Sequence, residues 1–230
     1  MIIVKCRKHA VPYRTVWFDP NPQFLIWPPR VYMQSPSREA RMGLRREPFF
    51  TLWSRLGDGP GASLAAMNAT SRNEVRQAQR AGVAGGEATA GEFVSFYNDF
   101  AELKRIATII EANLTAYGAS LMVTSARLGD RVLAMHALLL DPDSGRARLL
   151  HSASSRFTDS GDRALIGKSN RWLHWWEMQA AEQKGLRFYD WGGFAVGTTD
   201  PNMVGINGFK AAFGGQLVEE SNYYPRLPAG

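Results

Sequence analysis

The sequence predicts an α+β fold built on one mixed, mostly antiparallel twisted sheet flanked by helices. Three apolar segments, 119–128, 131–140 and 146–155, are separated by turn signals, as is typical of an antiparallel meander. A helix is predicted over 169–184 and a strand over 186–191. A helical connection lets two strands of one sheet run parallel. The meander therefore meets a parallel crossover pair, and ligands bind beside such junctions in open sheets.

The remaining elements fit a chain of 230 residues with 45% apolar and 21% charged residues, which is enough for one domain with a sizeable core. Residues 1–61 are expected to form a strand at 2–6 and an irregular wrap with one or two short elements, within the same domain. Residues 62–230 would form the core, with helices over 62–82, 92–117 and 204–213 and a last strand over 216–224. An aromatic stripe on the second helix is expected to pack inward; it consists of Phe93, Phe96, Tyr97 and Phe100.

The net charge of +6 attracts phosphates and other anions, although scattered surface charge explains it equally well. Cys6 is the single cysteine, and no Cys or His cluster has metal-ligand spacing. We therefore expect no metal and a cytoplasmic location. No apolar run reaches the ~20 residues that a bilayer span requires, so we expect no membrane segment.

An anion site is expected where the loop 158–167 leads into the predicted helix at 169. Free backbone amides and the positive end of the helix dipole attract anions, Gly167 permits close approach, and Lys168 adds charge. The segment does not match a Walker loop, because Gly161 stands six rather than five positions before Gly167. Ser169 or Asn170 acting only as a helix cap fits equally well.

The same predicted helix carries His174 and Glu177 at i, i+3. This spacing fits an ion pair, or a general base with its orienting carboxylate. Three tryptophans of this helix, Trp172, Trp175 and Trp176, are expected in the core.

Two charged residues lie next to glycine-rich turns. Asp190 ends a predicted strand, where a carboxylate can orient an amine or accept its proton, or simply cap the loop. Lys210 lies off the apolar face of its predicted helix, where it is either solvated or stabilises negative charge at the junction. Four glycines are expected to shape the backbone there: Gly192, Gly193, Gly214 and Gly215.

Four segments together resemble the FemABX-like and BioF2-like acyltransferases of the GNAT superfamily. Three are Asn-Arg-Trp-Leu-His-Trp at 170–175, Tyr-Asp-Trp-Gly-Gly at 189–193, and Gly-Ile-Asn-Gly-Phe-Lys followed by Phe-Gly-Gly within 205–215. The fourth, 71–83, is similar to that family's basic helix, with Arg72, Arg76 and Arg80 in one stripe. The four occur in the family's order and cover about 63–224.

The resemblance implies a GNAT-like sheet with a splayed acyl-donor cleft. It also implies direct attack by an amine on an activated acyl group, without a covalent enzyme intermediate. Aminoacyl-tRNA or acyl-CoA would be the co-substrate, and no permanently bound cofactor is expected. Phe209 and Lys210 match the family's donor-site pair, whose lysine balances negative charge near the reacting ester. The peptidoglycan-bridge transferases carry two GNAT-like domains, for which this length leaves no room, so a peptidoglycan pentapeptide precursor is not favoured as acceptor.

The leading hypothesis is an N-acyltransferase in which Asp190 orients the amine and Lys210 stabilises charge. The donor's phosphates would bind Lys168, Ser169 and Asn170, with help from Arg72 and Arg76. The acceptor would be an amine-bearing small molecule, sugar or peptide of cell-envelope, polysaccharide or peptide natural-product biosynthesis. The positive charge favours a tRNA donor slightly. The alternative is a catalytically silent module that binds RNA or a phosphorylated sugar carrier. In that case Asp190 and Lys210 substitutions would leave binding intact.

Overall fold

The computed structural model describes residues 1–8, 11–57, 59, 61–156 and 162–226. Within these residues the strands form one ten-stranded sheet in the order β1-β2-β3-β10-β4-β9-β8-β7-β6-β5. Neighbours are antiparallel except β2–β3 and β8–β9, which are parallel. The predicted mixed, mostly antiparallel sheet is confirmed. The strands are β1 Ile2–Lys8, β2 Val11–Trp17, β3 Arg30–Ser35, β4 Leu44–Arg55, β5 Ala84–Glu87, β6 Leu121–Leu128, β7 Arg131–Asp141, β8 Arg146–Ser154, β9 Phe188–Gly193 and β10 Gln216–Pro225.

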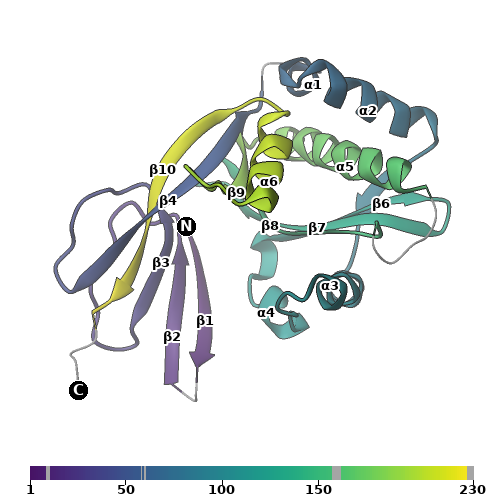
Figure 1. Ribbon diagram of the computed structural model, residues 1–230. Coiled ribbons are helices and arrows are strands. Elements are labelled where there is room, and N and C mark those ends of the chain that lie inside the picture. The colour runs from purple at the N-terminus through teal and green to yellow at the C-terminus, as the bar shows by residue number, and fades with distance from the viewer. Residues whose placement is uncertain (9–10, 58, 60, 157–161, 227–230) are drawn as a thin grey trace.

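Helices cover both faces of the β6–β8 part of the sheet (Figure 1). The long helix α5 packs on β6 and β7 with α2 against its outer side, whereas α3 packs on β7 and β8 from the opposite face. None of the described helices is both long and apolar enough to cross a membrane. The helices are α1 Ala62–Ala66, α2 Ala69–Arg80, α3 Ala90–Lys104, α4 Glu111–Thr115, α5 Arg163–Gln183 and α6 Pro201–Ala211, with a 3-10 turn η1 at Gly118–Ser120.

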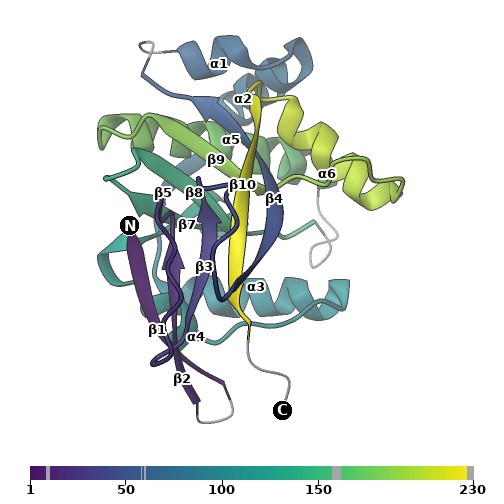
Figure 2. The same ribbon diagram turned by 90° about the vertical axis from the view of Figure 1, so that its left-hand side faces the viewer.

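The first sixty residues differ from the sequence prediction, which expected one strand and an irregular wrap. They form four strands, and β4 lies between β10 and β9 near the middle of the sheet. Figure 2 shows β4 and β10 side by side along their lengths. The partner of β4 lies about 170 positions further along the chain, so its pairing leaves no local pattern in the sequence.

Two of the predicted helices are shorter than expected. A polar capping residue divides the first, and a residue with left-handed backbone conformation ends the second. The helix expected over 62–82 divides at Asn68, whose Oδ1 accepts a hydrogen bond from the Ser71 amide (2.8 Å) and caps α2. The helix expected over 92–117 ends at Arg105, which has a φ of 54°. Its aromatic stripe packs inward as predicted, with Phe93 and Tyr97 in the core.

The parallel pair β8–β9 opens into a gap. The strands pair only over 146–148 and 188–190, although β8 continues to Ser154 and β9 to Gly193. The crossover between them is α5, as predicted. The strands therefore separate at the junction where the sequence places its candidate site residues.

Candidate active site

A cavity of about 640 Å³ lies at this opening. Its walls come from β8, α5, α6 and the end of β9, and Trp191 and Phe209 are the large aromatic side chains among them. Among the residues that the structure describes, the lining contains no carboxylate. The lining residues are Arg148, Leu149, Leu150, His151, Ser152, Asn170, His174, Trp191, Gly192, Gly193, Pro201, Asn202, Gly205, Ile206, Phe209 and Lys210.

Lys210 reaches this cavity from the last turn of α6, a helix that begins with Pro201 behind the Asp200 cap. Its Nζ donates a hydrogen bond to the backbone oxygen of Gly193 (2.5 Å). Burial and, to a smaller extent, the charge of Arg148 lower the pKa of Lys210 to about 8, against the opposing effect of Asp190. The ammonium is protonated at neutral pH, next to the turn that ends β9.

Arg148 is the second cation of the lining, on β8. Its Nε donates to Oε1 of Gln34 (2.7 Å), and its guanidinium carbon lies 4.8 Å from the ring centroid of Trp17. Burial lowers the pKa of Arg148 and nearby Asp190 raises it, but a guanidinium stays protonated in proteins. Two cations without a carboxylate in the lining make the cavity favourable to an anion.

Asp190 lies behind the cavity wall, with no exposed side-chain surface. Its Oδ1 accepts from the Gly192 amide (2.9 Å) and from the Thr51 hydroxyl. Its Oδ2 accepts from Gln34 Nε2 (2.9 Å) and lies 3.4 Å from Arg146 Nη1. Asp190 and Lys210 therefore flank the same Gly192-Gly193 turn, but only Lys210 lines the cavity. The orienting of an amine by Asp190 stays a prediction.

Asp190 belongs to a buried charge cluster that also contains Gln34, Arg146, Arg148 and Glu220. Arg146 Nη2 donates to Glu220 Oε1 (2.8 Å), and its guanidinium carbon lies 4.3 Å from the ring centroids of both Phe18 and Trp53. Burial raises the pKa of Glu220, against the opposing effect of Arg146. The sequence reasoning missed the cluster members other than Asp190. The Arg-x-Arg spacing at 146–148, which puts both side chains on one strand face, was the available signal.

A second buried network lies under α5 and is named here the Glu177 network. Glu177 Oε2 accepts a hydrogen bond from the Tyr189 hydroxyl (2.6 Å), whose oxygen lies 2.8 Å from His174 Nδ1. Glu177 Oε1 accepts from His136 Nδ1 (2.8 Å) and from the Thr124 hydroxyl. The rings of His136 and His174 stack with centroids 4.1 Å apart.

Burial disfavours charge throughout this network. The pKa of His174 is lowered to about 3, first by burial and then by His136. Burial acts to raise the pKa of Glu177, but the two histidines outweigh it and hold the carboxyl ionised. The pKa of Tyr189 is raised by burial and by Glu177, so its hydroxyl keeps its proton. The i, i+3 pair of the sequence is therefore bridged by a tyrosine.

The ligating atoms of His136, His174 and Glu177 lie within 4.8 Å of one another, a spacing that a metal ion could span. In the described residues these atoms bond to one another and to Tyr189 instead, and both Glu177 oxygens have partners. A metal ion would displace those bonds. The donor set therefore fits a hydrogen-bonded network better than a metal centre.

The helix start expected at 169 is wrong, because α5 begins earlier; phosphate binding by Lys168, Ser169 and Asn170 stays a prediction. The helix begins at Arg163, and its cap Asp162 accepts from the amides of Ala164 (2.9 Å) and Leu165 (3.0 Å). A carboxylate thus occupies the amides that an anion would need. Lys168 and Ser169 lie within the helix and outside the cavity lining; only Asn170 lines it. Residues 158–161 of the expected loop lie outside the described residues.

The basic stripe of α2 also lies apart from the cavity. Arg72 donates to the backbone oxygen of Ala65 (3.3 Å) and to that of Met67, so it holds the end of α1. Arg76 and Arg80 are exposed, and no residue of α2 is in the cavity lining. Binding of phosphates by Arg72 and Arg76 stays a prediction.

Three of the four glycines in the two turns are required by the backbone. Gly192 has a φ of 68°, and a Cβ there would lie 3.1 Å from the Leu149 oxygen. Gly214 has a φ of 76°, and a Cβ there would lie 2.7 Å from the Ala66 oxygen. A side chain is therefore disfavoured at both turns for conformational and steric reasons. Gly215 also has positive φ, whereas Gly193 does not.

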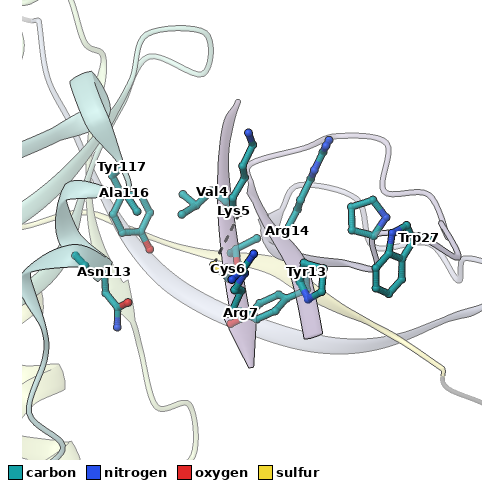
Figure 3. A pocket seen from close by; sticks show the side chains of 14 residues that line it. Val4, Lys5, Cys6, Arg7, Tyr13, Arg14, Trp27, Asn113, Ala116 and Tyr117 are labelled. Carbon is teal, nitrogen blue, oxygen red and sulfur yellow. Dashed lines mark hydrogen bonds between the residues drawn. The ribbon is translucent and has the colours of Figure 1, made fainter. Parts of the chain in front are cut away.

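A larger cavity, of about 810 Å³, lies on the N-terminal hairpin and is named here the hairpin cavity (Figure 3). Figure 3 shows Asn113, Ala116 and Tyr117 facing the β1–β2 hairpin across it. Lys5 and Arg14, which are direct cross-strand partners, line it together with Arg7, and its lining contains no carboxylate. Like charges opposite each other on a sheet are destabilising unless an anion offsets them. The sequence reasoning did not single out these residues.

No family model and no curated protein matches this chain. Solved structures do. FemX is 13% identical with a TM-score of 0.65, and the match covers 84% of this chain and 62% of FemX. L-PGS from Bacillus licheniformis is 12% identical with a TM-score of 0.58, covering 87% of this chain and 68% of that one. The C-terminal domain of a putative lysylphosphatidylglycerol synthetase from Agrobacterium fabrum is 13% identical with a TM-score of 0.55, covering 85% and 67%.

The class that the comparisons define is therefore one of fold: the chain has the fold shared by FemX and the lysylphosphatidylglycerol synthetases. The resemblance to the FemABX-like branch is confirmed at this level. The chain spans less than two thirds of the length of FemX.

Proposed function

We propose that this chain is an N-acyltransferase that moves an acyl or aminoacyl group to an amine in the cavity between β8 and β9. The observation that carries the proposal is the lining of that cavity, whose described residues include the cations Arg148 and Lys210 and aromatic walls but no carboxylate. Such a lining suits an anionic donor that reacts by acyl transfer. The fold shared with FemX, L-PGS and a putative lysylphosphatidylglycerol synthetase supports the same kind of reaction.

The reaction would be direct. The amine nitrogen attacks the carbonyl carbon of the donor, a C–N bond forms, the C–O or C–S bond to the leaving group breaks, and a proton passes from the amine to that leaving group. Negative charge develops on the carbonyl and on the leaving atom. The Lys210 ammonium, on a half-buried side chain at the cavity wall, would stabilise this charge.

Two features of the strands would position the donor. Beyond 148, β8 no longer pairs with β9, so, among the described residues, its backbone N–H and C=O groups on that edge would be available to bind amide groups of a donor. Asp190 accepts from the Gly192 amide, and Gly193 accepts from Lys210. Asp190 would therefore fix the turn that holds the Lys210 ammonium, and we assign it a positioning role.

The donor would be an aminoacyl-tRNA or an acyl thioester such as acyl-CoA. The net charge of +6 favours tRNA, since phosphate contacts supply most nucleic-acid affinity, although coenzyme A is a polyanion too. The acceptor would be an amine on a small molecule, a sugar or a peptide.

The test is transfer of a labelled group from charged tRNA and from acyl-CoA to a panel of amines, with the purified full chain. We expect transfer from one donor, lost in Lys210→Ala and retained in Lys168→Ala, whose lysine lies outside the cavity. A chain that unfolds cooperatively yet transfers from neither donor would refute the enzymatic proposal.

The hairpin cavity favours a second candidate, a module that binds a phosphorylated sugar carrier or RNA. No carboxylate among the described lining residues offsets the charges of Lys5 and Arg14, so a bound phosphate would stabilise this pair. The test is titration of a labelled sugar diphosphate and of a labelled RNA. Arg14→Ala should weaken binding with a smaller salt dependence, whereas Lys210→Ala should not. Equal weakening by both variants would contradict this candidate.

A further inference from the structure

One member of the Glu177 network, His174, lies in the wall of the acyl-transfer cavity, and its Nε2 atom could take part in the reaction there. His174 lines the cavity, yet its Nδ1 points into the interior, 2.8 Å from the Tyr189 oxygen. Its Nε2 has no hydrogen-bond partner among the described residues, and it is not one of their fully buried unpartnered atoms. We infer that Nε2 is the edge of the ring that faces the cavity.

The hydrogen bonds decide which nitrogen carries the proton. A carboxylate can only accept, so the single Tyr189 proton goes to Glu177 Oε2 at 2.6 Å. The Tyr189 oxygen then has only lone pairs to offer to His174 Nδ1, and Nδ1 must be the donor. A neutral imidazole protonated on Nδ1 carries its lone pair on Nε2. Glu177 and Tyr189 thus fix the tautomer of His174 from the opposite side of the ring.

We propose that His174 is a catalytic residue whose Nε2 accepts the proton that the amine loses on attack. The inference rests on the proposed acyl transfer. As the C–N bond forms, the proton moves from the amine nitrogen to Nε2. It then moves from Nε2 to the leaving oxygen or sulfur as the C–O or C–S bond breaks, so His174 ends the cycle neutral. The Glu177 carboxylate offsets the transient charge on the ring through Tyr189.

The surroundings of His174 suit a transient role. The ring lies against Trp191 (centroids 4.8 Å apart), Phe209 (5.6 Å) and Phe213 (5.7 Å), and it stacks on His136. Burial among these rings, followed by the neighbouring His136, lowers the pKa of His174 to about 3 and keeps the imidazole neutral between turnovers. The lone pair is therefore available at every pH at which the protein would act.

The first experiment needs no substrate. In a sample with ¹⁵N-labelled histidine, two-dimensional NMR of the wild-type chain should show His174 with Nδ1 protonated and Nε2 unprotonated between pH 5 and pH 8. Tyr189→Phe removes the oxygen that fixes the tautomer, so the two nitrogens should then exchange roles or average. A wild-type His174 protonated on Nε2 would overturn the proposal, whether or not a donor has been found.

The second experiment separates His174 from the proposed function. Once wild-type transfer is established, His174→Gln should lower kcat by about 10²- to 10⁴-fold, as for loss of a general base, with KM for the donor within a few-fold. Tyr189→Phe should lower kcat less. A His174→Gln variant that folds and keeps kcat within three-fold of wild type would remove His174 and leave the acyltransferase standing. If His174→Gln does not fold, the Tyr189→Phe rate decides: an unchanged kcat overturns the proposal.

Discussion

Two buried polar networks adjoin the cavity, and they differ in the charged groups that they contain. The charge cluster behind β9 joins two cations, Arg146 and Arg148, to two carboxyl groups, Asp190 and Glu220, so that the charges offset one another. The Glu177 network holds one carboxylate and keeps His174 neutral. The first network joins strands and presents a fixed cation to the cavity, whereas the second presents a lone pair. We therefore expect the wall at Arg148 to bind negative charge and the wall at His174 to transfer a proton.

The largest effect should follow from breaking the charge cluster. Arg146→Met leaves Asp190 and Glu220 buried without their main cation, which we expect to cost about 3–5 kcal/mol of unfolding free energy. The control is Arg45→Met, because the Arg45 side chain is 60% exposed in its ion pair with Glu47 and its loss should cost about 1 kcal/mol or less. Urea denaturation measures both. Equal losses would mean that the cluster does not organise the sheet.

The next largest effect is on turnover. Lys210→Ala should lower kcat by about 10²- to 10³-fold, the range seen when one charge-stabilising donor is removed. Lys168→Ala should leave kcat unchanged because Lys168 is outside the lining. Steady-state rates at saturating donor and acceptor provide the measurement. If Lys168→Ala has the larger effect, the anion site at α5 must be reconsidered.

The pH dependence of turnover should distinguish the two walls. Burial lowers the pKa of Lys210 to about 8, so the ammonium is protonated below that pH and loses its charge as the pH rises through it. The wild-type rate should therefore fall above pH 8. In Lys210→Arg the alkaline fall should disappear, since a guanidinium stays charged. His174 is already neutral in this range and should add no ionisation of its own.

The two networks also show which parts of the fold and of the site could be predicted from the sequence. The meander, the crossover helix and the glycine turns follow from local patterns, because turn residues and apolar periodicity act over a few positions. The charge cluster brings Gln34 into contact with Asp190, 156 positions away, and with Glu220, 186 positions away. No local pattern reports such a meeting, and the chain's first sixty residues read as irregular for the same reason.

The start of α5 shows a different failure. Gly167 and Lys168 look like a phosphate-binding helix start, yet Asp162 caps the helix five residues before Gly167. Asp162 caps the amides of Ala164 and Leu165, so the amides at 167–170 lie within the helix and not at its free end. His174 and Glu177 were recognisable as a pair from their spacing. Their connection through Tyr189 was not, because Tyr189 belongs to another element, β9.

A smaller effect on stability should separate the two adjacent glycines of the turn. Gly192→Ala places a side chain at a φ of 68° and a Cβ 3.1 Å from the Leu149 oxygen, which we expect to cost about 1–2 kcal/mol. Gly193→Ala is the matched control, since its nearest neighbour would be Phe49 at an ordinary 3.7 Å. Thermal denaturation compares them. If both variants are equally stable, the left-handed turn does not constrain the end of β9.

The smallest effect concerns Arg76, which is exposed on α2 and reaches neither network. A tRNA donor is long enough to extend past the cavity, so Arg76→Ala should raise its KM a few-fold and reduce the slope of log affinity against log salt by about 1. Unfolding free energy should stay within about 0.5 kcal/mol of wild type, as for most surface substitutions. Transfer from acyl-CoA, a shorter donor, should not change. An equal effect on both donors would place Arg76 at the cavity itself and contradict the separation of α2 from the site.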